Sequence, residues 1–426
     1  MSKTTKKRRR SKYRIQPMGY AALALILLII VLVVVLVVRG VSGGSGDRVA
    51  EPTPEITMEP EITPEPTPVP TPVPTPIPTA RSATIRSLGE IAIQDNLLAS
   101  AESDGSYDFS GMFTDISDII GNADFTIADV EGSLGGTSSA SGDTLMRTPP
   151  SLIQALKDCG VDMLNLANDH ALDGGFNDLQ AAIENCNAAG MEYVGAAASK
   201  EEHDQPKIIE INGIKVGFLA YTETLNGMES KTDAAAVEYG VNLAKNCSPA
   251  NDVKALRDAG AEVIVACVSW GEMLKRDATQ NQQSMAQVLT QSGVDVILGY
   301  NPHVIQRAMW LEVANSSHRT LCILSHGNFL SDSRSQYSDS GVIFQFTIKE
   351  KEDLSGFEII EPHYIPTYVW RIETGESAYD YRVLPAGQYL ETAPEDMNYA
   401  QESRMRAVWA EAQSIMGSDV AVVAKQ

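Results

Sequence analysis

Apolar runs of strand length recur along residues 83–372, and several are separated by stretches with helical spacing. The clearest run, 161–167, is followed by Asn168, Asp169 and His170 and then by a glycine pair. The runs 262–268 and 294–298 also end in polar residues, and helical patterns occupy 176–189, 249–259 and 277–292. A strand that ends in polar residues before a helix is how α/β folds present side chains at a sheet edge.

The remaining apolar runs extend this pattern to the whole body of the chain. Further strands are predicted at 82–88, 123–130, 192–196, 206–211, 215–221, 308–313, 320–325, 341–349 and 357–372, and a last helix at 394–416. Asn212-Gly213 separates two of these runs and indicates a tight hairpin. Strands and helices alternate in the first half, whereas the second half is mostly strands. This order predicts an α/β fold with mixed sheets over residues 83–390, followed by a C-terminal helical segment, 391–426.

The N-terminal 82 residues have a different composition. Residues 1–17 form a basic head, residues 18–38 carry no charge, and residues 39–82 are rich in proline. An uncharged run of this length can cross a bilayer as a helix, and the basic residues before it predict a cytoplasmic head. Signal-peptide cleavage is the alternative, because small residues follow the apolar run. We therefore expect a single-pass protein of the cell membrane, with a stiff linker and an extracytoplasmic body.

Charge is distributed unevenly along the chain. Residues 1–39 hold nine Lys and Arg and no acid, so the remaining residues hold 24 basic and 55 acidic side chains, a balance of −31. Such a body repels polyanions, which argues against nucleic acid as a partner. The five cysteines have no metal-binding spacing and are predicted to be free thiols, mostly buried.

Polar side chains that could carry chemistry follow most of the predicted strands. They are Glu90; Asp129 and Glu131; Asn168, Asp169 and His170; Ser269 and Glu272; Asn301 and His303; His326 and Asn328. If the strands are neighbours, these carboxylates converge and require a cation or protons to offset their repulsion. Oxygen donors with one or two imidazoles favour Mg²⁺, Mn²⁺ or Ca²⁺. The alternative is that each acid is a solvated loop cap, and that His170 only hydrogen-bonds locally.

Several of these segments resemble the CapA family of poly-γ-glutamate capsule synthesis proteins, whose domain is similar to the calcineurin-like metallophosphatases. The resemblance runs from about Leu88 to Phe329 and continues to about Pro385. Its blocks are SLGEIAIQDNLLASA, DGSYDFSGMF, ADFTIADVEGSL, RTPPSLIQALKDCGVDMLNLANDHALDGG, VSWGEM, GVDVILGYNPHVIQ and LSHGNFLSD. It implies a four-layer α-β-β-α sandwich in a membrane-anchored protein that assembles or anchors a capsule polymer.

The chain departs from the family pattern at five presumed ligand positions. Glu90 stands where the family has Asp, and Asp169 where it has Asn, so an oxygen donor is retained at both. Gln94, Ser269 and Asn301 each replace a histidine. A two-metal centre needs about seven donors, so the resemblance implies at most one cation, held by Glu90, Glu131, Asp169 and His303.

Two functional hypotheses follow from these residues. In the first, the body is not catalytic and binds a surface polymer or subunits of a membrane polymer synthase during capsule assembly. In the second, it is a metal-dependent hydrolase of a surface polymer or phosphoester, with His170 as the catalytic residue that protonates the leaving group or holds the reacting oxyanion. The lost imidazoles favour the first hypothesis, and whether the chain is an enzyme stays open at this point.

Overall fold

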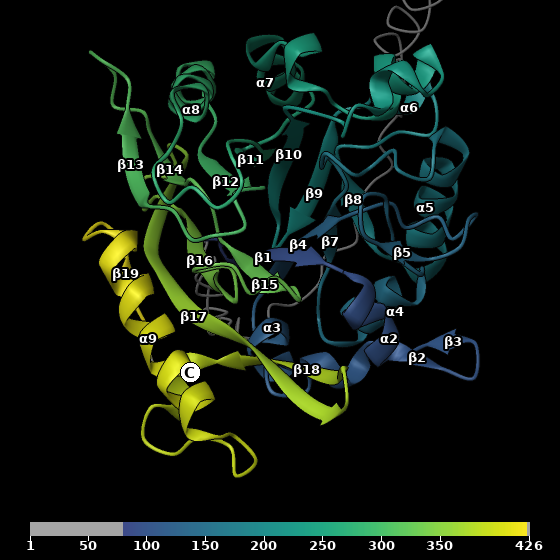
Figure 1. The fold of residues 1–426 in the computed structure, drawn as a ribbon. Helices are drawn as coiled ribbons and strands as arrows, with labels where there is room; N and C mark the ends of the chain where they lie inside the picture. The colour runs from purple at the N-terminus through teal and green to yellow at the C-terminus, as the bar shows by residue number, and fades with distance from the viewer. Residues whose placement is uncertain (1–79, 424–426) are drawn as a thin grey trace, which may run out of the picture. The chain divides into compact units, whose positions relative to one another are not determined.

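The computed structural model describes residues 80–423, which form two mixed β-sheets and the helices that cover them (Figure 1). The strands of the first sheet are β1 (Ser82–Ala92), β4 (Phe125–Glu131), β7 (Met163–Asn165), β8 (Glu192–Val194), β15 (Asn328–Leu330), β16 (Ser340–Glu350), β17 (Phe357–Gly375), β18 (Ala378–Pro385) and β19 (Ala421–Val422). Their order is β18-β17-β16-β1-β4-β7-β8, with β15 beside β1 and β19 beside β17. The pairs within β1-β4-β7-β8 are parallel, whereas β16, β17 and β18 pair in antiparallel fashion.

The second sheet is assembled from the middle of the chain. Its strands are β9 (Lys207–Ile211), β10 (Ile214–Thr222), β11 (Val263–Ser269), β12 (Val296–Tyr300), β13 (Ala308–Glu312) and β14 (Arg319–Ile323). They lie in the order β13-β14-β12-β11-β10-β9, with parallel pairs in the centre. The hairpin predicted at Asn212-Gly213 joins β9 to β10, and both turn residues have positive φ, as a two-residue hairpin turn requires. The prediction of an α/β fold with mixed sheets is confirmed.

The helices cover the outer faces of the two sheets, and the side chains of β11 show how. Val263, Val265 and Cys267 belong to the core between the sheets, whereas Ile264 and Ala266 pack against helices. The helices over this second sheet are α7 (Pro249–Asp258) and α8 (Gln280–Ser292). The first sheet packs against α2 (Asp95–Ala101), α4 (Ser151–Asp158) and α5 (Phe176–Ala189). Burial on both faces explains why these strands are apolar throughout.

The C-terminal part of the chain packs on the first sheet. Helix α9 (Tyr399–Met416) contributes Met405 and Val408 to a small core with Tyr368 and Trp370 of β17. Two shorter helices, α3 (Ser117–Gly121) and α6 (Lys200–His203), complete the α-helices of the described residues. The cysteines of residues 80–423 are free, and four of the five are buried, as predicted.

Several boundaries differ from those predicted, among them the end of β1 and the start of α9. Strand β1 continues through Glu90 to Ala92 rather than stopping at residue 88, because its register with β4 shifts between Ser87 and Glu90 and β15 pairs beyond that point. Helix α9 begins at Tyr399 rather than at residue 394, because the side chain of Asn398 caps its amino end. The apolar segment predicted to span the membrane lies outside the described residues, and among residues 80–423 no helix is long and apolar enough to span one.

Candidate functional site

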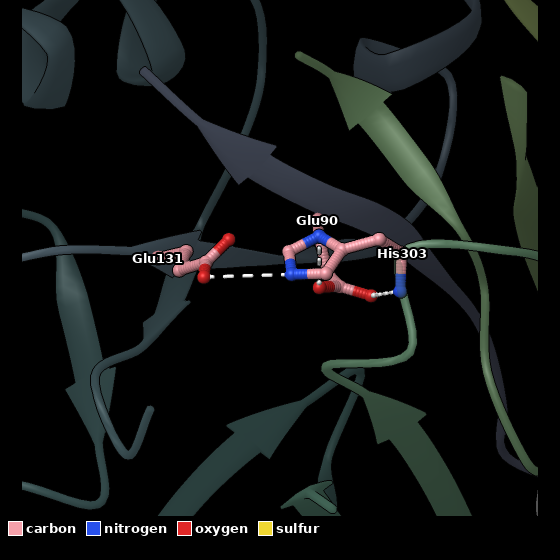
Figure 2. Close-up of side chains that lie close together, drawn as sticks. All are labelled: Glu90, Glu131 and His303. Atoms are coloured by element: carbon pink, nitrogen blue, oxygen red, sulfur yellow. Dashed lines mark hydrogen bonds and ion pairs between the residues drawn. The ribbon is translucent and has the colours of Figure 1, made fainter. Parts of the chain in front are cut away.

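Two buried carboxylates and one buried imidazole meet at the carboxyl ends of parallel strands (Figure 2). Glu90 lies in β1, Glu131 is the last residue of β4, and His303 lies in the loop after β12. Nδ1 of His303 is 3.1 Å from Oε2 of Glu90, and Nε2 is 3.5 Å from Oε1 of Glu131. The exposed fractions of Glu90, Glu131 and His303 are 1%, 5% and 6%. Both sheets therefore contribute to one cluster.

The loop that carries His303 is held in an uncommon backbone conformation. Asn301 has φ of 88° and His303 has φ of 58°, a region that non-glycine residues seldom occupy. The side-chain amide of Asn301 donates to two backbone carbonyls in the loop after β11, each at 3.1 Å. The backbone N–H of His303 donates to Oε1 of Glu90 at 3.2 Å, and Nδ1 lies 3.0 Å from Oδ1 of Asn328. These contacts fix the imidazole between the two carboxylates.

Burial and mutual charge shift the pKa values of this cluster. Burial raises the pKa of Glu90 to about 7, and the charge of His303 opposes that rise. Burial lowers the pKa of His303, but the charges of Glu131 and Glu90 outweigh it and raise the pKa to about 9. Asp129, buried beneath the cluster, has a pKa well above its usual value, chiefly because of burial. Without a metal, a protonated imidazole is what balances the buried carboxylates.

The donor atoms of the cluster are compatible with a divalent cation. Oε2 of Glu131 and Nε2 of His303 are buried and have no hydrogen-bond partner among residues 80–423. Buried polar atoms are seldom left in this state, because each costs about 1–3 kcal/mol. One donor atom from each of Glu90, Glu131 and His303 falls within 4.8 Å of the others. Carboxylate oxygens with a single imidazole suit a hard ion such as Mn²⁺, Mg²⁺ or Ca²⁺.

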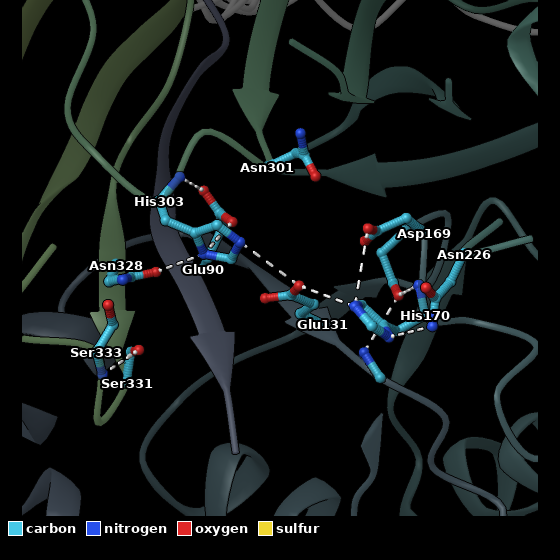
Figure 3. Close-up of polar contacts among 12 residues, drawn as sticks. Glu90, Glu131, Asp169, His170, Asn226, Asn301, His303, Asn328, Ser331 and Ser333 are labelled. Atoms are coloured by element: carbon cyan, nitrogen blue, oxygen red, sulfur yellow. Dashed lines mark hydrogen bonds and ion pairs between the residues drawn. The ribbon is translucent and has the colours of Figure 1, made fainter. Parts of the chain in front are cut away.

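A second group of side chains shares Glu131 with the first (Figure 3). Nε2 of His170 lies 3.6 Å from Oε1 of Glu131 and 3.8 Å from Oδ2 of Asp169. On its other side, Nδ1 lies 2.5 Å from Oδ2 of Asp173. Asn226 donates to the second oxygen of Asp173 at 3.1 Å. The imidazole is thus held on one edge and faces the carboxylate cluster with the other.

The turn after β7 places His170 and Asp169. Oδ1 of Asn168 accepts from the N–H of Gly132 at 3.1 Å and from that of His170 at 2.9 Å, which joins this turn to the end of β4. Burial lowers the pKa of His170, but the hydrogen bond to Asp173 and the neighbouring carboxylates raise it to about 9. Burial and the charge of Glu131 raise the pKa of Asp169 to about 6. His170 is therefore a proton donor at neutral pH, and 16% of its side chain is exposed.

The other polar residues predicted at strand ends have different surroundings. Gln94 accepts a hydrogen bond from the N–H of Asp332 at 2.7 Å and donates one to Ser331 at 3.1 Å. Asp129 accepts from Asn165 at 2.5 Å, so Glu131 rather than Asp129 reaches the cluster. Ser269 is buried at the end of β11, and Glu272 is exposed.

His326 is a core residue rather than a member of the cluster. Its ring stacks on Tyr300 with centroids 4.8 Å apart, and Nδ1 lies 2.9 Å from the carbonyl oxygen of Gly299. Burial lowers its pKa to about 4, so the ring is neutral. Two residues of this group, Asp173 as the partner of His170 and Asn226, were not predicted from the sequence. Asp173 could be suspected from its spacing of three residues, whereas Asn226 comes from an irregular segment without a recognisable pattern.

Comparisons with known proteins agree with the resemblance seen in the sequence. The family model of the bacterial capsule synthesis protein PGA_cap matches residues 84–333. The capsule biosynthesis protein CapA of Bacillus anthracis is 26% identical over 201 residues, which are 46% of this chain and 47% of that protein. The PGA biosynthesis protein CapA of Bacillus subtilis (strain 168) is 26% identical over 220 residues, 50% of this chain and 54% of that protein. The chain thus spans about half the length of these curated relatives.

Solved structures give more distant similarities. The calcineurin-like phosphoesterase YfkN from Bacillus subtilis has a TM-score of 0.41 and 13% identity, over 68% of this chain and 91% of that one. A phosphatase from Mycoplasma pneumoniae has a TM-score of 0.37 and 14% identity, over 68% of this chain and 94% of that one. Likenesses at this level carry no weight for the reaction or the ligands of this chain.

Proposed function

This chain belongs to the bacterial capsule synthesis family, and from that membership and the geometry of its site we propose that it acts in the biosynthesis or anchoring of poly-γ-glutamate or a related surface polymer. The observation that carries the proposal is the convergence of Glu90, Glu131 and His303 in one buried cluster. We propose that this cluster holds a single divalent cation, Mn²⁺, Mg²⁺ or Ca²⁺, with Asp169 beside it.

A cation gives an acidic body a means of contacting an acidic polymer. The residues after Arg39 carry a balance of −31, so direct attraction of polyglutamate by surface charge is unfavourable. When bound, the cation supplies a local positive charge to which a polymer carboxylate can be ligated. Glu90, Glu131 and His303 hold the cation and bury it on the protein side, and Asp169 and His170 form the more exposed side of the site.

Hydrolysis of a surface polymer or phosphoester is the second candidate function, and the pairing of His170 with Asp173 favours it. Asp173 fixes the orientation of the imidazole at 2.5 Å and keeps Nε2 turned towards Glu131. With a pKa of about 9, His170 carries a proton at neutral pH that it can give to a leaving oxygen. In this candidate function, the body has a metallophosphatase-like, four-layer fold, and the hydrolysis takes place at its carboxylate cluster.

The cellular setting of the proposal comes from the N-terminal residues, which lie outside the described range. The basic residues 1–17, the uncharged residues 18–38 and the proline-rich linker 39–82 support a single-pass anchor in the cell membrane with an extracytoplasmic body. Its partners would be the membrane itself, the surface polymer and subunits of a membrane polymer synthase.

Metal analysis of the purified full chain tests the proposal. We expect about one Mn²⁺ per chain after dialysis, loss of that ion in His303→Ala, and little phosphodiesterase turnover, because a two-metal centre lacks donors. Retention of the ion in both His303→Ala and Glu131→Gln would overturn the cation site. Two tightly held ions together with turnover that disappears in His170→Ala would establish the hydrolase instead.

A further inference from the structure

The segment between β4 and α4 contains buried polar atoms that the cation site does not use. The side-chain atoms Nε of Arg147, Oγ of Ser133 and Oγ1 of Thr148 are buried without a hydrogen-bond partner among residues 80–423. Ser133 is 3% exposed and Thr148 is 1% exposed. Oγ of Ser151, the first residue of α4, is in the same state. Four such atoms within one short segment indicate that the segment is built to contact a further polar group.

Backbone pairing places Arg147 between two serines. Arg147 lies in β6 (Met146–Arg147), which pairs with β5 (Ser141–Gly142) so that Arg147 is opposite Ser141. On its other side Arg147 forms a parallel bridge with Ser133. The backbone of Arg147 is therefore held from both sides, by Ser141 and by Ser133.

Arg147 has no carboxylate partner within the described part of the chain, which is unusual in a body so rich in acid. Most other arginines of residues 80–423 that are not exposed make ion pairs, as Arg81 does with Glu350 and Arg404 with Asp339. Arg147 instead lines a cavity of about 230 Å³ together with Ser138, Thr148 and Pro150. Pro150 is also the N-cap of α4, whose amino end favours a negative charge.

We propose that Arg147, with the hydroxyls of Ser138 and Thr148 beside it in the lining of this cavity, forms a binding pocket for an oxyanion. The ligand is a carboxylate or phosphate group, because guanidinium and hydroxyl donors match oxyanion acceptors and the cavity has room for a group of that size. The pocket is separate from the cation site and does not depend on it. The two share a segment, since the N–H of Met146 donates to Asp173, the partner of His170, at 2.7 Å.

The test uses the full chain freed of metal with a chelator, so that the cation site takes no part. Inorganic phosphate and a short glutamate oligomer are titrated separately by calorimetry. We expect at least one of them to bind saturably, and its affinity to fall about tenfold or more in Arg147→Ala, because a charge-assisted pair is lost. Arg147→Lys, which keeps the charge but not the paired donors, should lose less, and Ser138→Ala, at another residue of the cavity lining, should weaken binding several-fold. Arg319→Ala is the control, since Arg319 is exposed on the other sheet.

The two ligands identify the source of the anion. Binding of phosphate alone indicates a phosphoryl ligand, whereas tighter binding of the oligomer indicates a carboxylate of the polymer. Circular dichroism of each variant shows whether it is folded. The pocket is refuted if neither ligand binds saturably, if folded Arg147→Ala and Arg147→Lys both bind as the unaltered chain does, or if binding appears only with metal present. Each of these outcomes leaves the metal content of the cation site unchanged, so this inference can fail while the proposed function stands.

Discussion

Replacement of His326 by phenylalanine should make the protein less stable at neutral pH and more stable in acid. The ring is buried, stacks on Tyr300, and lies edge-on to Phe344 with centroids 6.1 Å apart. Phenylalanine can occupy the same space and keep both ring contacts. It cannot make the hydrogen bond from Nδ1 to the carbonyl oxygen of Gly299, which keeps only the bond from the backbone N–H of residue 326 at 3.2 Å. At about pH 7 the expected loss of unfolding free energy is therefore that of one hydrogen bond, about 0.5–1.5 kcal/mol.

The effect in acid has the opposite sign. Burial lowers the pKa of His326 from 6.5 to about 4, so the unfolded chain takes up a proton first as the pH falls. The contribution of the neutral ring to the free energy of unfolding is fully present above pH 6.5, and it is lost as the pH falls through about 4. The shift corresponds to about 3 kcal/mol. Because phenylalanine does not titrate, the variant escapes this loss, and the two stability curves should cross between about pH 6 and pH 4.

Urea unfolding of the full chain, followed by tryptophan fluorescence at several pH values, measures the crossing. Differences between variant and unaltered chain remove the contributions of distant titrating groups, since those add independently. His203→Phe is the control, because His203 is exposed on α6. Parallel curves for His326→Phe and the unaltered chain would show that His326 does not lose its proton on folding, and the account of the ring as a neutral core residue would be wrong.

Three further outcomes concern the cation site. Because the pKa of His303 is about 9, a cation that binds to its imidazole must displace a proton. The apparent affinity for the cation, measured by calorimetry, should therefore rise about tenfold per pH unit from about pH 7 to pH 9. An affinity independent of pH would exclude His303 as a ligand. Asp173→Asn should lower the pKa of His170 from about 9 towards 6.5 in an NMR titration, because the hydrogen bond that His170 donates to the Asp173 carboxylate raises this pKa. An unchanged pKa would contradict that cause. Asn301→His should weaken binding of the first cation rather than add a second, because the substitution removes two hydrogen bonds that hold the loop of His303. Two ions per chain in a metal analysis of this variant would refute the prediction.

Elements specified by local sequence could be predicted closely. Helix α5 occupies the predicted residues Phe176–Ala189, because Gly175 and Gly190 at its two ends both have positive φ. The extension of β1 through Glu90 could not be predicted, since it depends on pairing with β15, more than 200 residues later in the chain. A Cβ on Gly89 would lie 2.4 Å from a carbonyl oxygen in that part of the chain, so the glycine is needed for a contact that its local sequence does not indicate.

The candidate site was predictable in its membership but not in its contacts. The apolar runs that end in Glu131, Asn168 and Asn301 were recognisable as strands, and parallel strands bring their carboxyl ends to one edge. Which of Asp129 and Glu131 enters the cluster depends on Asn165, which binds Asp129 from the neighbouring strand. The role of Asn226 depends on an irregular segment whose path is set by packing rather than by periodicity.

Amides at two positions where the resemblance implies imidazoles support the proposal of a single cation. The side-chain amides of Gln94 and Asn301 form hydrogen bonds with backbone groups of neighbouring segments. In this way Gln94 holds the segment that follows β15, and Asn301 ties the loop of His303 to the loop after β11. The donors that remain are divided into two groups that share Glu131, one deeply buried around His303 and one more exposed around His170. We therefore propose one cation beside a protonated His170, because the two groups share Glu131 and the remaining donors are too few for two ions.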